Sequence, residues 1–161
     1  MDAYVNGVAT APNAFGAIIG TSGSDRISGT TGNDKLHGGQ GVDYLYGGAG
    51  NDTFGFKLSD FDAALGSAAQ DFIYDFSGAG MYLAGDNDFL SFTGFGAGST
   101  LTLDVARSDA AQAFAITRGY ITGPEKLQYY VIHSAATGQD YEIFVKSMNG
   151  NALGQGDYNF Y

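Results

Sequence analysis

Apolar side chains recur at every ninth position between residues 20 and 55, at Ile27, Leu36, Leu45 and Phe54. A three-residue strand whose middle side chain points inward accounts for one apolar residue in each unit, and glycines before it permit the positive φ angles of a tight turn. One such unit has nothing to bury its side chain against, so the period predicts turns stacked into a coil. Ile18 precedes Ile27 by nine residues, and we expect residues 17–20 to supply a capping strand.

Each unit also carries an aspartate at its sixth position. The units read GTSGSDRIS, GTTGNDKLH, GGQGVDYLY and GGAGNDTFG, and the aspartates are Asp25, Asp34, Asp43 and Asp52. Stacking would bring these carboxylates together, which is repulsive unless a cation lies between them. Calcium accepts six to eight oxygen ligands in a flexible cage, whereas magnesium requires a tight octahedron and keeps its waters. The spacing therefore predicts several calcium ions between the turns.

The motifs GGQGVD and GGAGND, each followed by an apolar residue at position eight, resemble the nonapeptides of RTX (repeats-in-toxin) calcium-binding proteins. The resemblance implies an all-β, right-handed parallel β-roll in which alternate repeats form two facing sheets. It pairs Asp25 with Asp43 on one edge and Asp34 with Asp52 on the other. Further ligands would be carbonyl groups of the turns around Gly20, Gly23, Gly29, Gly32, Gly38, Gly41, Gly47 and Gly50. Thr21 and Thr30 replace glycine at position two, so we expect weaker sites there; the alternative is glycine-rich turns without metal.

The segments AAQDFIYDF and GDNDFLSF are similar to the cap that ends the repeats in serralysin-type proteases and alginate epimerase modules. Asp71 and Asp75 match that cap, which implies that Asp71 closes the last calcium turn; a strand-edge aspartate is the alternative. Residues 85–88 lack the glycine and glutamate of an EF-hand loop and are interpreted as a turn before a strand.

The remaining sequence predicts a strand-rich extension of the roll. Residues 100–105, 127–133 and 141–147 have the β-branched and aromatic content of antiparallel strands. Ser59, with Asp60 and Asp62, suits the start of a short helix before residues 63–69, the one helix we expect. The final GDYNFY is either a last core strand or an uncleaved type I secretion signal. We expect a single domain: a lead at 1–19, repeats at 20–55 and a cap at 56–161.

The negative net charge of the chain limits the classes of molecule that it is expected to bind. The chain has 161 residues, a net charge of −10 and no cysteine, which disfavours nucleic acid and anionic membranes. Neither a run of about 18 apolar residues nor a cleavable signal peptide is visible. In a cytosol poor in calcium the repeats should stay unfolded, and external calcium would fold them. We therefore expect a secreted or cell-surface protein, and the RTX resemblance implies export by type I secretion machinery.

Catalysis is not indicated. The chain has two histidines, His37 and His133, and lacks HExxH, GxSxG and phosphate-loop motifs. A structural or adhesive extracellular role is the primary hypothesis. One alternative is binding of an alginate-like polysaccharide by Arg26, Tyr44 and Tyr46 on the outer face of the first and third repeats. Another is calcium-dependent self-assembly into a surface layer or matrix.

Overall fold

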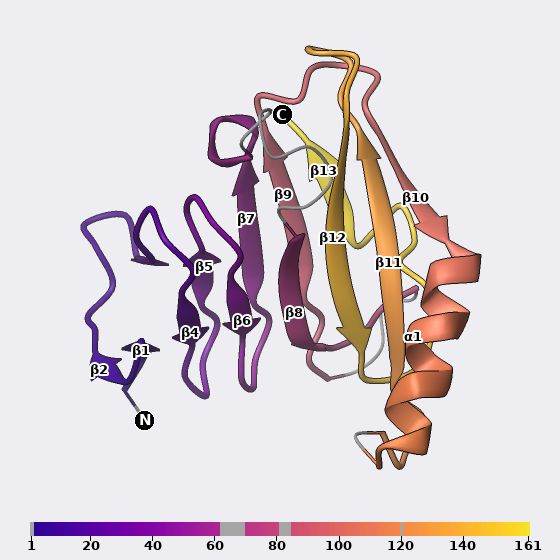
Figure 1. Ribbon diagram of the computed structural model, residues 1–161. Helices are drawn as coiled ribbons and strands as arrows, with labels where there is room; N and C mark the ends of the chain where they lie inside the picture. Colours follow the sequence, from indigo (N-terminus) through magenta and orange to yellow (C-terminus); the bar gives the residue numbers. More distant parts are fainter. Residues whose placement is uncertain (1, 62–69, 81–84, 120) are drawn as a thin grey trace.

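The structure is a computed structural model that describes residues 2–61, 70–80, 85–119 and 121–161. It consists mostly of strands, with one α-helix, and widens from a narrow coil near the N-terminus to a broad cap (Figure 1). The coil strands are β3 (Ala17–Ile19), β4 (Arg26–Ser28), β5 (Lys35–His37), β6 (Tyr44–Tyr46), β7 (Thr53–Lys57), β8 (Gln70–Phe76) and β9 (Phe89–Thr93). The flanking strands are β1 (Tyr4–Val5), β2 (Val8–Ala9), β10 (Thr100–Asp104), β11 (Lys126–His133), β12 (Asp140–Ser147) and β13 (Tyr158–Phe160).

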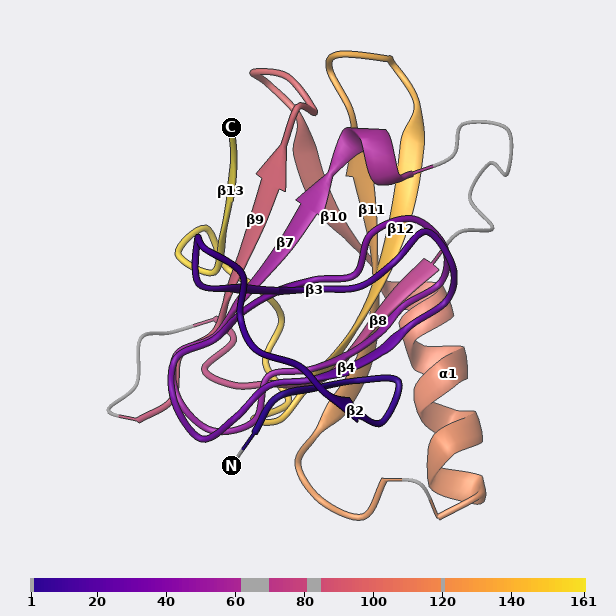
Figure 2. The same ribbon diagram turned by 90° about the vertical axis from the view of Figure 1, so that its left-hand side faces the viewer.

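Successive coil strands alternate between two facing sheets. Sheet A has the order β10-β11-β12-β8-β6-β4-β1-β2, and sheet B has the order β13-β9-β7-β5-β3. All pairings in sheet B are parallel, and the apolar positions are in register: Ile27 lies opposite Leu45, and Leu36 lies opposite Phe54. Figure 2 shows the turns that join the two sheets. The predicted parallel β-roll is confirmed, and Ile18 extends its register opposite Leu36.

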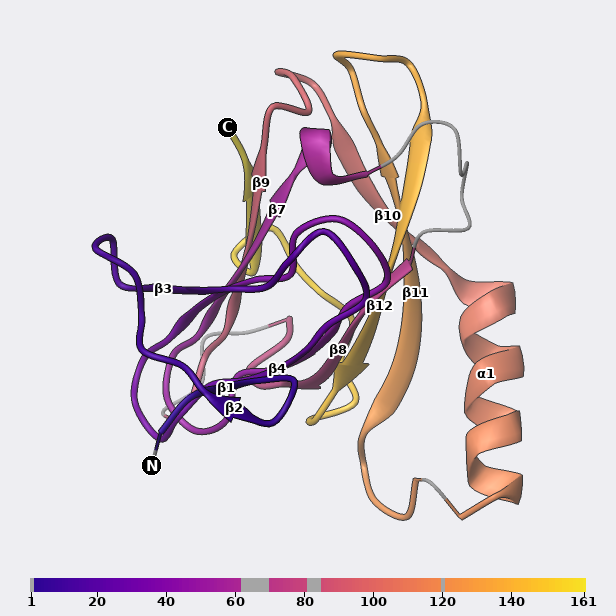
Figure 3. The ribbon, with the colours of Figure 1, turned by 60° about the vertical axis from the view of Figure 1, so that its left-hand side comes forward.

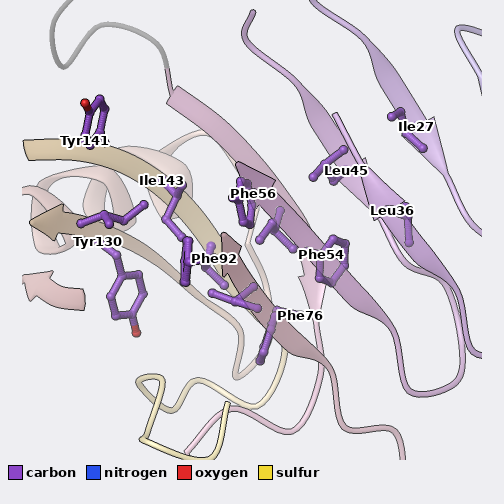
Figure 4. Packing of buried hydrophobic residues seen from close by; sticks show 14 of the residues in the cluster. Ile27, Leu36, Leu45, Phe54, Phe56, Phe76, Phe92, Tyr130, Tyr141 and Ile143 are labelled. Atoms are coloured by element: carbon purple, nitrogen blue, oxygen red, sulfur yellow. The ribbon is translucent and has the colours of Figure 1, made fainter. Parts of the chain in front are cut away.

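The core is a single file of apolar side chains in the roll that broadens in the cap. Ile18, Ile27, Leu36, Leu45 and Phe54 are at most 1% exposed. Figure 4 shows the labelled repeat residues leading to a wider cluster in the cap. Each repeat thus buries one side chain and depends on its neighbours to bury it, which makes the roll sensitive to how its polar turns are held.

The roll continues past the four repeats. Strand β8 pairs in parallel with β6, placing Ile73 opposite Leu45, and β9 pairs with β7, placing Leu90 opposite Phe54. Ile73 and Leu90 are both fully buried. One further coil, made of β8 in sheet A and β9 in sheet B, therefore follows the regular repeats, although longer connections separate its strands.

The cap extends sheet A. Strands β10, β11 and β12 pair antiparallel, with Tyr130 opposite Ile143, and β12 then pairs in parallel with β8. The predicted strands at 100–105, 127–133 and 141–147 are thus observed, shifted by a residue at some ends. The C-terminal β13 pairs in parallel with β9 and adds an edge strand to sheet B.

The prediction of a single helix near residues 59–69 missed the main helix, α1 (Val105–Thr117). Asp104 is its N-cap and accepts a hydrogen bond from the backbone nitrogen of Arg107 at 3.0 Å. Its apolar residues do not gather on one face, since Val105, Phe114 and Ile116 are exposed while Ala115 is buried. The helix therefore lacks the 3.6-residue pattern that marks a helix in sequence.

The predicted helix at 59–69 falls mostly on residues 62–69, which lie outside the described residues. Before them the chain forms a 3-10 turn over Leu58–Asp60, so Ser59 lies inside a turn rather than capping a helix. In the part of the chain that the structure describes, no helix has both the length and the apolar character needed to cross a membrane.

Candidate metal centre

The position-six aspartates form two columns, one beside each sheet. The first column contains Asp25, Asp43 and Asp71, which precede or begin strands of sheet A. The backbone nitrogen of Asp25 donates to Oδ1 of Asp43, and that of Asp43 donates to Oδ1 of Asp71, both at 2.9 Å. Asn6 caps the N-terminal end, its Nδ2 lying 2.5 Å from Oδ1 of Asp25. Each carboxylate thus ties its own turn to the preceding one.

The second column contains Asp34, Asp52 and Asp88, which precede strands of sheet B. The backbone nitrogen of Asp34 donates to Oδ1 of Asp52 at 2.8 Å, and that of Asp52 donates to Oδ1 of Asp88 at 2.9 Å. Asp88 was not among the predicted site residues, because residues 85–88 were interpreted only as a turn. The signal was Asn87-Asp88-Phe89-Leu90, which repeats the Asn-Asp-x-Leu spacing of the second unit.

Position two of each repeat decides whether the second carboxylate oxygen has a partner. In the first repeat, the backbone nitrogen and the hydroxyl of Thr21 lie 2.5 and 2.9 Å from Oδ2 of Asp25. Thr30 makes the same two contacts with Asp34, at 2.6 and 2.9 Å. The third and fourth repeats have glycine there, and Oδ2 of Asp43 and of Asp52 is buried with no hydrogen-bond partner among the described residues.

These orphaned oxygens lack basic counter-charges. The ion pairs among the described residues involve Asp60, Glu142, Asp140 and Glu125, and none involves a column aspartate. A buried carboxylate with neither a hydrogen-bond partner nor a cation costs free energy on folding.

Burial accordingly raises the pKa of several column aspartates. Desolvation, with a smaller contribution from the neighbouring carboxylate, raises the pKa of Asp43 and Asp52 from 3.8 to about 6. The same causes raise the pKa of Asp71 to about 8 and that of Asp88 to about 7. The columns are therefore destabilised as anions and are suited to a bound cation.

The turns stack most closely at the glycines of the third and fourth repeats. Gly39 and Gly48, at position two, have φ angles of +102° and +99°. A Cβ atom at Gly39 would overlap the carbonyl oxygen of Thr21, and one at Gly48 would overlap that of Thr30. The glycines of the first two repeats do not adopt left-handed φ angles, contrary to our expectation for those turns; there the hydroxyls of Thr21 and Thr30 accept hydrogen bonds from the backbone nitrogens two residues later.

The available donors are oxygen atoms only, which fits calcium. Within the described residues, no three His, Asp or Glu side chains converge into a group that could hold a metal ion. A calcium ion here would therefore combine one or two carboxylates with backbone carbonyl groups, as expected for a hard cation. Asp43 and Asp52, each with an orphaned Oδ2 beside the glycine at position one, are the best-placed carboxylates.

The two predicted cap aspartates, Asp71 and Asp75, accept hydrogen bonds from backbone nitrogens in the third and fourth repeats. Asp71 is buried at the end of the first column. Asp75 accepts hydrogen bonds from the backbone nitrogens of Gly47 and Gly48, at 2.9 and 3.0 Å. Asp71 thus extends a column, whereas Asp75 fixes the glycine turn of the fourth repeat.

The residues predicted to bind sugar lie on the outer face of sheet A and belong to a larger aromatic surface. The guanidinium of Arg26 lies 4.7 Å from the centre of the Tyr46 ring. The Tyr44 ring stacks on that of Phe72 at 5.3 Å, and Tyr46 stacks on Tyr74 at 5.1 Å. The cap therefore supplies aromatic neighbours that the repeat sequence alone did not indicate.

Both histidines have structural contacts. Nδ1 of His37 lies 2.6 Å from the carbonyl oxygen of Gly55, and its Nε2 lies 2.9 Å from Oδ2 of Asp60. His133 contacts Asp140 across the β11–β12 pair at 2.7 Å. Neither histidine lies in an aspartate column.

Comparison with known proteins agrees with this geometry. Residues 19–54 match the family model described as RTX calcium-binding nonapeptide repeat, in four copies. No curated protein matches the chain. The match covers the regular turns of the roll, whereas residues 55–161 lie outside it. Residues 19–54 of this chain thus carry four RTX calcium-binding nonapeptide repeats.

Proposed function

We propose that the chain is a secreted calcium-binding module whose roll folds when calcium enters the turns, and that it has a structural or adhesive, non-catalytic role outside the cell. The observation that carries this proposal is the pair of buried, unpartnered Oδ2 atoms of Asp43 and Asp52. Asp25, Asp34 and Asp71, together with the carbonyl groups of the glycine turns, complete the proposed ligand set.

Calcium bound between the column aspartates would replace the repulsion between their carboxylates with attraction to the ion. Without it, stacked carboxylates of like charge oppose folding; with it, each ion is shared between turns that otherwise bury one apolar side chain each. Binding free energy then becomes folding free energy because the unfolded chain has no assembled site. The roll should accordingly form only where free calcium is abundant.

This coupling is the reason for proposing export. A chain that stays unfolded at low calcium passes a type I secretion channel more readily than a folded one, and millimolar calcium outside then drives folding. Residues Tyr158–Phe160 form β13, which is followed by Tyr161. A secretion signal at these residues would therefore become part of sheet B after export.

Calorimetric titration of chelator-treated protein with calcium tests the proposal, with magnesium as the comparison cation. We expect saturable binding of more than one calcium ion accompanied by a gain of β structure in circular dichroism, and little response to magnesium at the same concentration. A matched pair of variants assigns the site. Asp52→Asn should weaken calcium binding, whereas Asp109→Asn, on the exposed side of α1, should not. Equal binding by both variants would remove Asp52 from the site.

A second candidate function, binding of an acidic polysaccharide, is favoured by one observation. Arg26, Tyr44, Phe72, Phe144 and Tyr129 lie opposite one another in register across five neighbouring strands of sheet A. The exposed Tyr44 ring, at the Arg26 end of the row, can stack on the apolar face of a sugar ring, and Arg26 can bind a carboxylate; Phe144, farther along the row, is buried.

Titration of the calcium-loaded protein with alginate oligosaccharides, and with neutral glucan oligosaccharides of equal length, tests this candidate. We expect binding of the acidic oligosaccharide that is lost in Arg26→Gln and kept in Lys126→Gln. No binding of alginate by the wild-type chain would exclude this ligand.

A further inference from the structure

A cleft of about 570 Å³ lies between α1 and the outer face of sheet A. Its walls are formed by Phe72, Tyr74, Ala111, Phe114, Ala115, Ile121, Leu127, Tyr129, Phe144 and Lys146. Cavities that bind small molecules typically measure about 300–1,000 Å³ and are lined by apolar and aromatic groups with few polar ones. The size and the lining of this cleft fall within that description, and no column aspartate contributes to it.

Polar residues of α1 hydrogen-bond to the edge of β11, so the helix does not pack its side chains closely against the face of sheet A. The cleft remains between the helix and that face. Strand β10 ends at Asp104, opposite Tyr129, and the helix continues from there. Ser108 Oγ accepts from the backbone nitrogen of Tyr129 at 2.9 Å, and Gln112 Oε1 accepts from that of Leu127 at 2.9 Å. Figure 3 shows the helix standing beside β11, away from the roll.

Small side chains on α1 leave the space beneath it. Ala111 and Ala115, one helical turn apart, line the cleft on the helix side, and aromatic rings line it on the sheet side. The rings contact one another: Phe72 and Phe144 lie 5.1 Å apart, and Phe144 and Tyr129 lie 5.0 Å apart. Aromatic rings of the sheet thus face two alanines of the helix, with the exposed Phe114 ring beside them.

Lys146 is the one charged residue among those that line the cleft. Its Nζ forms an ion pair with Oε1 of Glu125 at 3.8 Å, which is too long for a hydrogen bond, and its charge also acts on Asp75; among the described residues Nζ donates no hydrogen bond. Two of the lining rings also have a guanidinium over them: Arg107 lies 4.7 Å from the Tyr129 ring and Arg118 lies 5.3 Å from the Phe114 ring. Arg107 is itself paired with Glu142.

Of the seven basic residues in a chain with net charge −10, one therefore lines this apolar cleft and two lie over rings that line it; Lys146 and Arg107 each have a carboxylate partner, and that of Lys146 lies beyond hydrogen-bond distance. A neutral apolar molecule would leave the Lys146 ammonium without a hydrogen-bonding partner, and a cation would be repelled by it. An anionic head group would satisfy its donors with a charge-assisted hydrogen bond.

We propose that this cleft binds a small amphipathic carboxylate, with its aliphatic or aromatic body between Ala111, Ala115 and the rings of sheet A and its carboxylate at Lys146. The roll's calcium sites are separate from the cleft, so this inference goes beyond the proposed function. The cleft belongs to the cap, and calcium enters its test only by keeping the whole chain folded.

The test uses the calcium-loaded full chain and the fluorescent anion 1-anilinonaphthalene-8-sulfonate. We expect saturable binding of this probe, competition by laurate, and at least about tenfold weaker competition by dodecyltrimethylammonium, which has the same chain length and the opposite charge. Equal competition by the two amphiphiles would overturn the assignment of a carboxylate ligand.

Two matched pairs of variants locate the site. Ala111→Phe fills the cleft and should abolish probe binding, whereas Ala113→Phe, on the exposed side of the helix, should leave it unchanged. Lys146→Gln should weaken laurate binding about tenfold, whereas Lys126→Gln should not. Circular dichroism of each variant checks that the chain is folded. Undiminished probe binding by folded Ala111→Phe would contradict the proposed location, and undiminished laurate binding by Lys146→Gln would contradict the role of Lys146.

Discussion

Oδ1 of Asp43 accepts a hydrogen bond from the backbone nitrogen of Asp25 at 2.9 Å, while Oδ2 of the same Asp43 is buried without a hydrogen-bond partner. One oxygen of the carboxylate thus joins two turns of the roll, and the other remains for a cation. The same division occurs at Asp52, whose Oδ1 accepts from Asp34. The columns therefore provide both the connection between turns and the proposed calcium ligands.

Replacing Asp43 should have opposite effects with and without calcium. In chelator, Asp43→Asn removes a buried carboxylate that lies beside Asp25 and Asp71, so the folded fraction, which is small for the wild type, should be larger for the variant and should persist to a higher urea concentration. In calcium, the lost ligand should weaken binding at least about tenfold and reverse the order of stability. Urea titrations in both buffers measure this. A variant less stable than the wild type in chelator would contradict the repulsion argument.

The calcium-free roll should become less stable as the pH rises. The pKa values of Asp43 and Asp52 are raised from 3.8 to about 6 in the folded chain, and those of Asp88 and Asp71 to about 7 and 8. Between pH 4 and 8 the folded state therefore binds more protons than the unfolded state, and stability falls with rising pH. In calcium the trend should reverse, because protons compete with the ion for the carboxylates. Thermal unfolding at pH 5 and pH 8, with and without calcium, measures both slopes.

Gly48 is required mainly for the close approach of two turns. Gly48 and Gly98 have similar φ angles, +99° and +91°, but a Cβ at Gly48 would overlap the Thr30 carbonyl oxygen, whereas one at Gly98 meets nothing within 4 Å. Gly98→Ala should cost only the backbone strain, of about 1–3 kcal/mol. Gly48→Ala should cost more, because the turns must also separate. Chemical denaturation of both variants in calcium measures the difference, and equal losses would show that backbone strain alone accounts for Gly48.

Asp88 should matter although it lies outside the regular repeats. Its Oδ1 and Oδ2 accept hydrogen bonds from the backbone nitrogens of Asp52 and Ser77, at 2.9 and 2.8 Å. Asp88→Ala leaves both buried donors unpaired and should destabilise the calcium-loaded chain by about 2–4 kcal/mol. Asp86→Ala, at an exposed neighbouring position, should change stability by less than about 0.5 kcal/mol. A small effect of Asp88→Ala would mean that the second column ends at Asp52.

The regular part of the roll was predictable because one apolar residue and one aspartate recur at every ninth position. The strand positions follow from the apolar residues Ile27, Leu36, Leu45 and Phe54. The pairing of Asp25 with Asp43 identifies the edge of the roll where the carboxylates gather. The separation into two sheets follows because adjacent repeats face opposite directions, and the pairing of residues 18 apart is its consequence.

The continuation of the roll was harder to predict because the spacing changes. Asp43 and Asp71 are 28 residues apart, and Asp52 and Asp88 are 36 apart, instead of the 18 that separate the pairs within the repeats. Insertions of this kind break a sequence period without breaking the stack, since loops can leave the coil and return. The motif before Leu90 was visible, but its distance from the fourth repeat concealed its role.

The helix and the cleft could not be predicted for a different reason. The inward side chains of α1 are Ser108, Ala111, Gln112 and Ala115, which are small or polar and leave no apolar stripe in the sequence. Its attachment depends on hydrogen bonds from residues of β11 that lie 21 and 15 positions later in the chain. The aromatic rings on the sheet side of the cleft likewise belong to β8, β11 and β12, which only the sheet order brings together.

The central claim, that calcium holds the stacked turns together, is tested most directly by the hydrodynamic radius of the chain, measured by light scattering on a size-exclusion column. Runs in chelator and in a few millimolar calcium should give an expanded monomer and a compact monomer, respectively. Growth into large species after compaction would identify calcium-gated self-assembly as the task of the folded roll. The same compact radius in both buffers would contradict the account, because the columns would then be stable without the ion.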